Sequence, residues 1–398
     1  MRTGLDRLPT SPTLVATLTS SRVGLLAHPA SVDRTLTHVS DVLEGLAIRP
    51  RIIFGPEHGY GGEAQDMIGV GDAKDRRGIP IRSLYGESFD DLIPKESDLR
   101  EIDVLVVDMQ DVGSRYYTFI WTAVLAMRAC ARAGVRMIVL DRPNPLGANA
   151  IEGRSLEPVF RSFVGLEPIP IRHALTLGEV CAWRREAEQL PKEVLSVLCA
   201  SDVSPDALAS EWEVKPVFPS PNMPTVDTML VYPGGCLLEG TNLSDGRGTT
   251  RPFEVTGAPF VDGWRLAKGL AETALPGFTA RPLTFRPTFH KHAGLECGGV
   301  HIHVTDPKAF RPVATYAALI ALAHHQAPEA FRFRTERYEF VDTIPAFDLL
   351  TGSDRSRKAI LANESPRSIA EDLSHTSDAD RAVVASAKSA LVSSTILL

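Results

Sequence analysis

The chain has 398 residues, of which 44% are hydrophobic and 23% are charged. Such a composition is ordinary for a soluble globular protein, and the length exceeds what one compact core usually holds, so we expect two domains. With 49 acidic and 42 basic residues the net charge is −7, which argues against the basic face that nucleic-acid binding needs. It does not exclude an anionic ligand, because a few converging arginines can bind one.

The sequence contains no apolar run of the roughly 20 residues that a membrane helix needs. Polar Thr and Ser residues interrupt the N-terminal segment where a signal peptide would carry its apolar core. The five cysteines are scattered without a CxxC pair, which predicts buried free thiols rather than a zinc site or a disulfide framework. These features predict a cytoplasmic protein without a membrane span.

Short apolar runs alternate with helical stretches over the first half of the chain, a pattern typical of a parallel sheet covered by helices. It predicts strands at residues 23–27, 51–54, 81–85, 103–108 and 137–140, a helix ending near residue 46, and a longer one from about 117 to 133. The run at 103–108 is almost continuously apolar, as in a strand buried on both faces. Gly134 is expected to end the longer helix. We therefore expect an α/β, Rossmann-like fold with helices on both faces of a mostly parallel sheet.

Residues 216–259 are rich in Pro, Gly, Asn and Thr, which predicts a long irregular segment that is either functional or a domain junction. Beyond it the pattern predicts a helix at 264–275, a strand at 299–305, a helix at 309–324 and a helical segment from 368 onwards. We expect a Rossmann-like catalytic domain at residues 1–256 and a smaller auxiliary α+β domain, which closes the cleft, at residues 257–398.

Polar residues gather where the predicted strands end, which is where open parallel sheets bind ligands. Glu57 and His58 follow the second strand, Asp108, Gln110, Asp111, Arg115 and Tyr116 follow the fourth, and Asp141, Arg142 and Asn144 follow the fifth. This density of carboxylates, amides and arginines predicts an active site. An aspartate at a strand end can also cap the next helix, and for Asp111 and Asp141 that alternative stays open.

Glu57 is the sharpest catalytic prediction. Pro56 restrains the backbone before it, while Gly55 and Gly59 permit close approach or unusual dihedrals on either side. Such a loop presents a carboxyl group reproducibly, as general acid catalysis requires. The alternative is a loop glutamate paired with an arginine. His58 could act as a base, orient another group or bind a metal, although a lone histidine of this kind is more often structural.

Two further patterns bear on cofactor binding. Gly59–Ala64 matches the G-x-G-x-x-A dinucleotide fingerprint, but it is displaced from the strand and lacks the acidic residue that should follow about 20 residues later. His301 and His303 share one face of a predicted strand, and His290-Lys291-His292 lies nearby, but no acidic or Cys partner has matching spacing. The sequence thus predicts neither a nucleotide cofactor nor a metal site.

Seven blocks between about Val23 and Asp306 together resemble the NamZ-like exo-β-N-acetylmuramidase family, formerly a domain of unknown function. The blocks are FGPEHGYGGEAQD, DVLVVDMQDVGSRYYT, IVLDRPNPLG, SFVGLEPIPIRHALTLGE, PSPNMPT, YPGGCLLEGTNLSDGRGTTRPFE and GAPF. The resemblance implies hydrolysis of a terminal N-acetylmuramic acid from the non-reducing end of peptidoglycan fragments. It also implies that Glu57 is the catalytic glutamate. Many family members carry export signals, which this sequence does not display.

Glycoside hydrolysis generally uses two carboxyl groups. With Glu57 as the acid, Asp108 or Asp111 is the expected partner, ahead of Glu239. A planar guanidinium suits the lactyl carboxylate of muramic acid, which makes Arg115, Arg142, Arg247 and Arg251 candidates for binding it. The residues expected to contact other parts of the substrate are Gln110, Tyr116, Asn144, Asn222, Thr241, Asn242 and His292.

The sequence is also compatible with two other functions. One is a catalytically silent sugar-binding protein on the same fold, because a fold does not fix a function. The other is an amidase or esterase acting on cell-wall ligands, although the sequence lacks a G-x-S-x-G nucleophile elbow.

Overall fold

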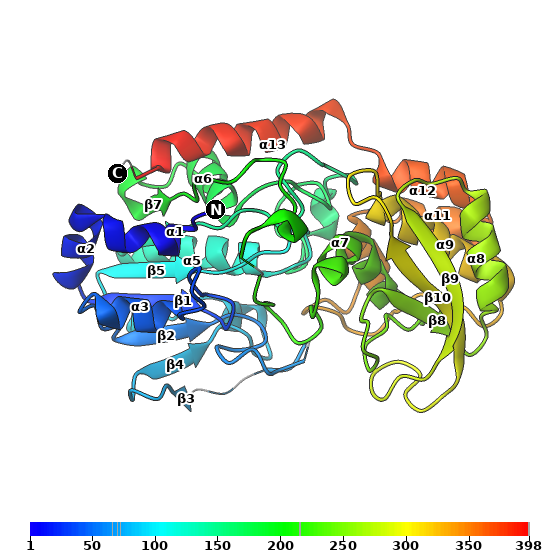
Figure 1. Cartoon of the computed structure of the whole chain (residues 1–398), viewed down its shortest axis with the longest axis horizontal. Helices are drawn as coiled ribbons and strands as arrows, with labels where there is room; N and C mark the ends of the chain where they lie inside the picture. Colours follow the sequence, from blue (N-terminus) through cyan, green and yellow to red (C-terminus); the bar gives the residue numbers. More distant parts are fainter. Residues whose placement is uncertain (66, 70, 72, 215, 397–398) are drawn as a thin grey trace.

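The computed structural model describes residues 1–65, 67–69, 71, 73–214 and 216–396. Its first unit is built on a seven-stranded sheet in the order β3-β4-β2-β1-β5-β6-β7 (Figure 1). The strands are β1 Val23–Ala27, β2 Ile52–Gly55, β3 Ala73–Lys74, β4 Pro80–Ser83, β5 Val104–Asp108, β6 Arg136–Leu140 and β7 Leu195–Leu198. Neighbouring strands are parallel except β3 and β4. The predicted Rossmann-like parallel sheet is confirmed.

Helices cover both faces of this sheet because its central strands are apolar on both sides. In β5, Val104 and Val106 belong to the apolar cluster on one face, while Leu105 and Val107 belong to the cluster on the other. The first face is covered by α1 Gly4–Arg7, α2 Pro12–Thr19 and α3 Val39–Gly45, and the second by α4 Glu96–Leu99, α5 Phe119–Ala133 and α6 Leu177–Ala187. As predicted, α5 ends at Gly134, whose φ is 69°.

The second unit contains a three-stranded antiparallel sheet in the order β8-β10-β9. Its strands are β8 Val255–Ala258, β9 Phe278–Phe285 and β10 Cys297–Val304. Its helices are α7 Val226–Gly235, α8 Gly263–Glu272, α9 Pro312–Gln326, α10 Ala346–Thr351, α11 Arg355–Leu361 and α12 Pro366–Ser374. Helix α9 packs against α7, α8 and α12, so it is the central helix of this unit.

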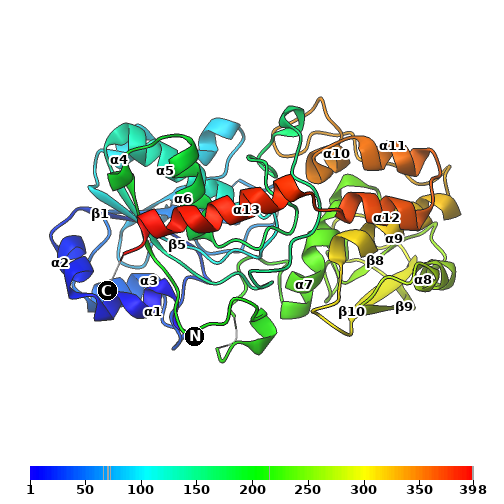
Figure 2. The same cartoon turned by 90° about the horizontal axis from the view of Figure 1, so that it is seen from above.

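The chain passes between the two units twice. It enters the second unit before α7 and leaves it after α12, and the last helix, α13 Asp378–Leu391, returns to pack against α6 of the first unit (Figures 1 and 2). Both termini therefore lie at the first unit (Figure 2). One apolar cluster also runs through both units and contains Trp121 of α5 as well as Tyr316 of α9. Two crossings and a shared core hold the units together.

The structure corrects the expectation that residues 216–259 lack regular structure. They contain α7, the short 3-10 helix η6 Cys236–Gly240 and the whole of β8. A Cβ atom at Gly234 would lie 2.1 Å from the carbonyl oxygen of Pro312, so the glycine-rich sequence serves the close approach of α7 to α9. Residues 226–256, which the sequence grouped with the first domain, pack in the structure with α9 and β10.

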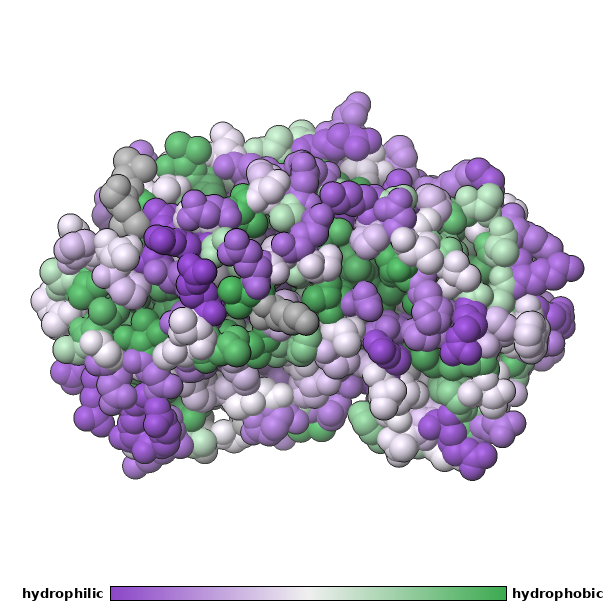
Figure 3. Space-filling model, viewed as in Figure 1, coloured by the Kyte–Doolittle hydropathy of each residue, from purple (hydrophilic) through white to green (hydrophobic). Residues whose placement is uncertain are grey.

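The surface mixes hydrophilic and hydrophobic residues, and the outline in Figure 3 is notched at its lower margin between the two units. Within the described part of the chain, no helix is long and apolar enough to cross a membrane. All five cysteines are free, and four of them are buried, as predicted.

Candidate active site

Glu57 stands on a tight loop directly after β2. A Cβ atom at Gly55 would lie 2.5 Å from the backbone nitrogen of Tyr60, so the loop can fold back only over a glycine. His58 and Gly59 have φ values of 70° and 81°, and Nδ1 of His58 lies 2.9 Å from the carbonyl oxygen of Ala64. A residue other than glycine at positive φ costs on the order of 1 kcal/mol and persists where its surroundings hold it. The loop therefore holds Glu57 in one defined position.

The side chain of Glu57 is only 7% exposed. The hydroxyl of Thr118 donates a hydrogen bond of 2.7 Å to its Oε2 atom. Thr118 ends the segment between β5 and α5, which also brings Tyr116 and Tyr117 to the pocket. The Tyr116 hydroxyl donates to the carbonyl oxygen of Pro233 in α7. The first unit thus supplies the buried carboxyl group, and the second unit helps to fix its surroundings.

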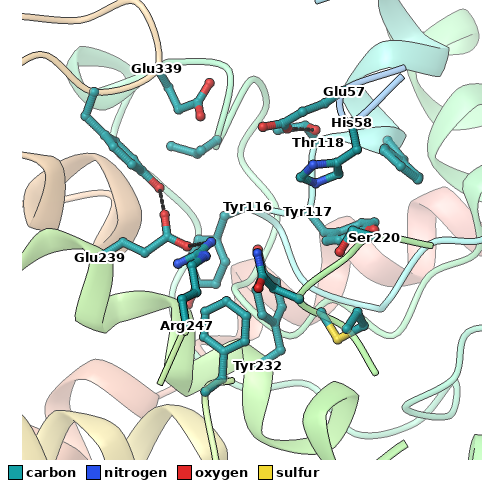
Figure 4. Close-up of a pocket in the computed structure, with 16 residues that line it drawn as sticks. Glu57, His58, Tyr116, Tyr117, Thr118, Ser220, Tyr232, Glu239, Arg247 and Glu339 are labelled. Atoms are coloured by element: carbon teal, nitrogen blue, oxygen red, sulfur yellow. Dashed lines mark hydrogen bonds and ion pairs between the residues drawn. The ribbon is translucent and has the colours of Figure 1, made fainter. Parts of the chain in front are cut away.

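The second unit supplies the opposite wall, where Glu239 of η6 lies across the pocket from Glu57 (Figure 4). Nη2 of Arg247 donates to Oε1 of Glu239 at 2.7 Å, and the Tyr338 hydroxyl donates to Oε2 at 2.7 Å. Glu339 also lines this wall. Two carboxyl groups with different partners, Glu57 with a threonine and Glu239 with an arginine and a tyrosine, therefore share one pocket.

The charge state of Glu239 follows from its partners. Burial alone would raise the pKa of its carboxyl group, but the charge of Arg247 and the hydrogen bonds from Tyr338 and Arg247 outweigh burial, so the pKa lies below its ordinary value. Glu239 is therefore ionised at neutral pH. Burial raises the pKa values of the Tyr116 and Tyr338 hydroxyls well above the usual range, which keeps both neutral.

The pocket has an empty volume of about 500 Å³, part of which is open to solvent. Its floor is aromatic and its walls carry carboxyl, amide and hydroxyl groups, a mixture that suits the apolar faces and hydroxyls of a sugar ring. The lining residues are Glu57, His58, Tyr116, Tyr117, Thr118, Phe119, Val164, Ser220, Asn222, Met223, Tyr232, Glu239, Arg247, Phe253, Tyr338 and Glu339.

The fold brings several of the predicted site residues into this pocket. They are Glu57, His58, Tyr116, Asn222, Glu239 and Arg247. The side-chain nitrogen of Asn222 donates to Oε1 of Gln65 at 2.7 Å, which fixes the amide at the pocket edge. Glu57 and Glu239 come from different units, so their meeting depends on how the units pack.

The remaining strand-end residues do not line the pocket. Asp108 and Arg142 form a buried ion pair with each other, with Nε to Oδ1 at 2.5 Å and Nη2 to Oδ2 at 2.9 Å. Oδ2 of Asp111 accepts from the backbone nitrogen of Gly113 at 2.6 Å and so supports a turn. The side chains of Gln110 and Asn144 donate to backbone carbonyls, Gln110 to Asp111 and Pro143, and Asn144 to Leu175.

Arg115 is fully buried away from the pocket and donates to the carbonyl oxygens of Arg154, Ile169 and Leu350. Asp141 acts as a helix cap, since its Oδ1 accepts from the backbone nitrogen of Gly178 at the start of α6 at 2.9 Å.

Four other residues of the second unit were predicted to contact the substrate, but their side chains bond to the protein itself. The Thr241 hydroxyl donates to Leu238, Asn242 bonds the backbone of Ala330 and Arg332, His292 contacts the carbonyl oxygen of Asn242, and Arg251 pairs with Glu254. None of these four residues lines the pocket. They shape the loops that carry Glu239 and Arg247.

Sequence reasoning missed several pocket residues. Thr118 and Ser220 lie close to residues that were predicted, within the same sequence blocks, so their neighbours gave a usable signal. Tyr338 and Glu339 belong to a segment after α9 that carries no motif, and nothing in their local pattern distinguishes them.

Within the described residues no cluster of three or more His, Cys, Asp or Glu side chains could hold a metal ion. The ring centroids of His301 and His303 lie 3.8 Å apart with the rings tilted by 42°, and Nε2 of His301 lies 3.5 Å from Oε2 of Glu254. His301 therefore contacts Glu254, and neither histidine lines the pocket.

Comparisons with known proteins agree with this architecture. The family models for the N-terminal and C-terminal parts of the exo-β-N-acetylmuramidase NamZ match residues 23–227 and 230–383. The chain is 41% identical over 362 residues to the peptidoglycan β-N-acetylmuramidase NamZ of Bacillus subtilis strain 168, covering 90% of this chain and 84% of that protein.

Two crystal structures of DUF1343 family proteins from Bacteroides fragilis have the same fold. The first is 28% identical with a TM-score of 0.85, covering 96% of this chain and 97% of the other. The second is 27% identical with a TM-score of 0.74, covering 98% of each chain. From the matches to both family models and the identity to the Bacillus protein, the chain belongs to the NamZ exo-β-N-acetylmuramidase family.

Proposed function

We propose that this chain is an exo-acting glycoside hydrolase that releases terminal N-acetylmuramic acid from the non-reducing end of peptidoglycan fragments. Family membership and the activity in the name of the Bacillus relative support this proposal. The structural observation that carries it is the pair of carboxyl groups, Glu57 and Glu239, in different environments across one pocket. Glycoside hydrolysis generally uses such a pair.

In the proposed mechanism Glu57 is the general acid. It gives its proton to the glycosidic oxygen as the bond to the leaving sugar breaks, and the Thr118 hydroxyl orients its carboxyl group. Glu239, whose lowered pKa makes it a weak base, stays ionised and stabilises the positive charge that develops on the sugar ring. A water molecule then adds to the anomeric carbon, and the proton that it loses restores the acid form of Glu57. We prefer Glu239 to Asp108 and Asp111 as the partner because it lines the pocket with Glu57 and they do not.

The pocket also offers groups for substrate recognition. Tyr116 and Tyr232 present aromatic surface to a sugar ring, and Asn222 can bond the acetamido group or a hydroxyl. We assign recognition of the lactyl carboxylate to Arg247. It is the one of the four candidate arginines that lines this pocket.

The test is Glu57→Gln, measured with a chromogenic N-acetylmuramic acid glycoside and with a natural muramic acid–glucosamine disaccharide. Loss of a general acid should lower kcat by about 10²–10⁴-fold while muramic acid binding is retained. The loss should be larger for the disaccharide, because a sugar alkoxide leaves poorly without a proton whereas a nitrophenolate leaves readily. Equal losses on both substrates would argue against the acid role.

Glu63→Gln is the matched control, since Glu63 belongs to the same loop but does not line the pocket. It should keep near wild-type turnover. If the wild-type protein binds muramic acid but turns over no muramyl or glucosaminyl glycoside, it is a sugar-binding protein instead. Release of peptide or acyl products with the glycosidic bond intact would indicate an amidase or esterase.

We also propose that the protein acts in the cytoplasm, because its five cysteines are free, as is usual for proteins in a reducing compartment. A cytoplasmic enzyme would meet peptidoglycan fragments that the cell has taken up, rather than the intact wall. Fractionation of the host cell followed by activity measurement on each fraction tests this. Activity confined to the exported fraction would contradict it.

A further inference from the structure

The β9–β10 loop contains a strained tripeptide, His290-Lys291-His292. The two histidines have φ values of 67° and 58°, so residues other than glycine adopt the left-handed region on both sides of Lys291. The loop is tied down on either side, because the backbone nitrogen and the hydroxyl of Thr288 both donate to Gly248, and Nε2 of His292 lies 2.6 Å from the carbonyl oxygen of Asn242. Strain of this kind persists where the surroundings enforce it, often for a functional reason.

The consequence of this conformation is that Lys291 points inward. Its side chain is 17% exposed, and its Nζ lies 3.4 Å from Oδ2 of Asp245. Nζ also donates to the carbonyl oxygens of Leu238 at 2.9 Å and Leu243 at 3.2 Å. Leu238 directly precedes Glu239, so the lysine holds the backbone that carries the pocket carboxylate.

Lys291 also completes a chain of alternating charges. Asp245 lies between Lys291 and Arg247, and Nη1 of Arg247 donates to Asp245 at 2.9 Å. Nη2 of Arg247 donates to Glu239 at 2.7 Å. Two buried carboxylates are thus balanced by two cations. His290 adds a third contact, with its Nδ1 3.5 Å from Oδ1 of Asp245.

We propose that Lys291 is a positioning residue for the reaction. It offsets the charge of Asp245, so that Arg247 stays engaged with Glu239 and Glu239 stays ionised in the pocket. The proposal rests on the proposed function insofar as Glu239 is the ionised partner of Glu57. Lys291 itself does not line the pocket, so it acts through Asp245 and Arg247.

The electrostatics of the network support this role. Burial and the negative charge of Asp245 act to raise the pKa of Glu239, but the charge of Arg247 and the hydrogen bonds from Tyr338 and Arg247 lower it by more. The Cys236 thiol also donates to Glu239, and Tyr116, Tyr232 and Lys291 interact electrostatically with it. Lys291 and Arg247 overcome burial to hold the pKa of Asp245 well below its usual range. Without Lys291, two buried carboxylates would share one guanidinium, and one of them would take up a proton more readily.

Three variants should each affect the acidic limb of the pH profile of kcat/KM in a stated way. Lys291→Met should move this limb to higher pH by about one unit, because Glu239 loses a nearby positive charge. Asp245→Asn should move it to lower pH, because a competing negative charge is lost. The double variant should return the limb close to its wild-type position. A purely structural role for the lysine predicts no such rescue, since the hydrogen bonds to Leu238 and Leu243 stay broken.

A second readout needs no substrate and therefore separates this inference from the proposed function. The melting temperature of Lys291→Met should fall furthest below wild type near pH 7 and approach it toward pH 4, where a buried carboxylate can be protonated. Lys308→Met, at a lysine whose side chain is 68% exposed, is the matched control and should show neither effect. A pH-independent melting difference, or a double variant no better than Lys291→Met, would overturn the proposal. If wild type lacks turnover but the melting pattern holds, only the enzymatic assignment fails.

Discussion

Four arginines were expected to bind a substrate carboxylate, and the structure gives them different surroundings. Arg115 is enclosed by backbone carbonyls and Arg142 is paired with Asp108. The side chain of Arg251 is 45% exposed and pairs with Glu254. Arg247 lines the pocket, where its Nη2 donates to Glu239 and its Nη1 donates to Asp245. The residue type supplied the four candidates, but the sequence could not say which guanidinium lines the pocket.

Arg247→Lys tests the proposed recognition of the lactyl group. A lysine keeps the charge but loses the planar, forked donor arrangement that can bind two carboxylate groups at once. We expect the ratio of kcat/KM for N-acetylmuramic acid over N-acetylglucosamine glycosides to fall about tenfold, measured with matched chromogenic substrates. Arg251→Lys is the control and should leave the ratio unchanged. Equal loss on both sugars would instead place Arg247 solely in support of Glu239.

At the level of secondary-structure elements, the start of α6 shows how a strand-end carboxylate can serve the fold. Asp141 follows β6, and its carboxylate accepts from the Thr176 hydroxyl at 2.7 Å and from the backbone nitrogen of Gly178 at 2.9 Å. Thr176 and Glu179 add a capping box at the same helix end. Both readings of Asp141 were open from sequence because an N-cap and a catalytic aspartate share the same position after a strand.

Asp141→Asn should change how stability depends on pH. Burial raises the pKa of Asp141 to about 6, although Thr176 and Gly178 oppose this. The folded state therefore binds the proton more tightly than the unfolded state. Asp141 lowers the free energy of unfolding as pH rises between its ordinary value of 3.8 and about 6.

Asparagine removes this titration. Relative to the variant, wild type should lose roughly 2 kcal/mol of unfolding free energy between pH 4 and pH 7, as measured by urea denaturation. A difference between the two proteins that stays constant with pH would contradict the assignment.

At the scale of the whole molecule, the pocket exists because two units are packed together. Arg115 contributes directly to this packing, since it is 0% exposed and its Nη2 donates to the carbonyl oxygen of Leu350 in α10 at 2.8 Å. Its Nη1 donates to Arg154 and Ile169 of the first unit. Helix α13 adds a second connection when it returns to α6.

Arg115→Met should destabilise the protein without directly altering the chemistry of the pocket. The substitution leaves three carbonyl groups without their donor, and we expect the free energy of unfolding to fall by about 3 kcal/mol in urea denaturation. Arg115→Lys keeps a charge and one donor group, so its loss should be smaller. A stable Arg115→Met protein with a changed sugar preference would instead restore Arg115 to the substrate site.

By itself, the sequence determined the parallel sheet and the loop that presents Glu57. Both depend on local signals, namely continuous apolar runs such as residues 104–107 and a glycine–proline pattern around one carboxylate. The position of the domain boundary depends on contacts between residues distant in sequence. The sequence placed it after residue 256, whereas the two family models meet between residues 227 and 230. In the structure, α7 already packs on α9 of the second unit.

Only the tertiary structure decided which polar residues meet. Asp108 and Glu57 both lie at the ends of parallel strands, yet Asp108 forms an ion pair with Arg142 outside the pocket. The pocket wall that faces Glu57 comes instead from Glu239, Tyr338 and Glu339 of the other unit. The physical reason is that periodicity and turn chemistry act over a few residues. The pairing of side chains across the pocket depends instead on the packing of two units whose contacts are distant in sequence.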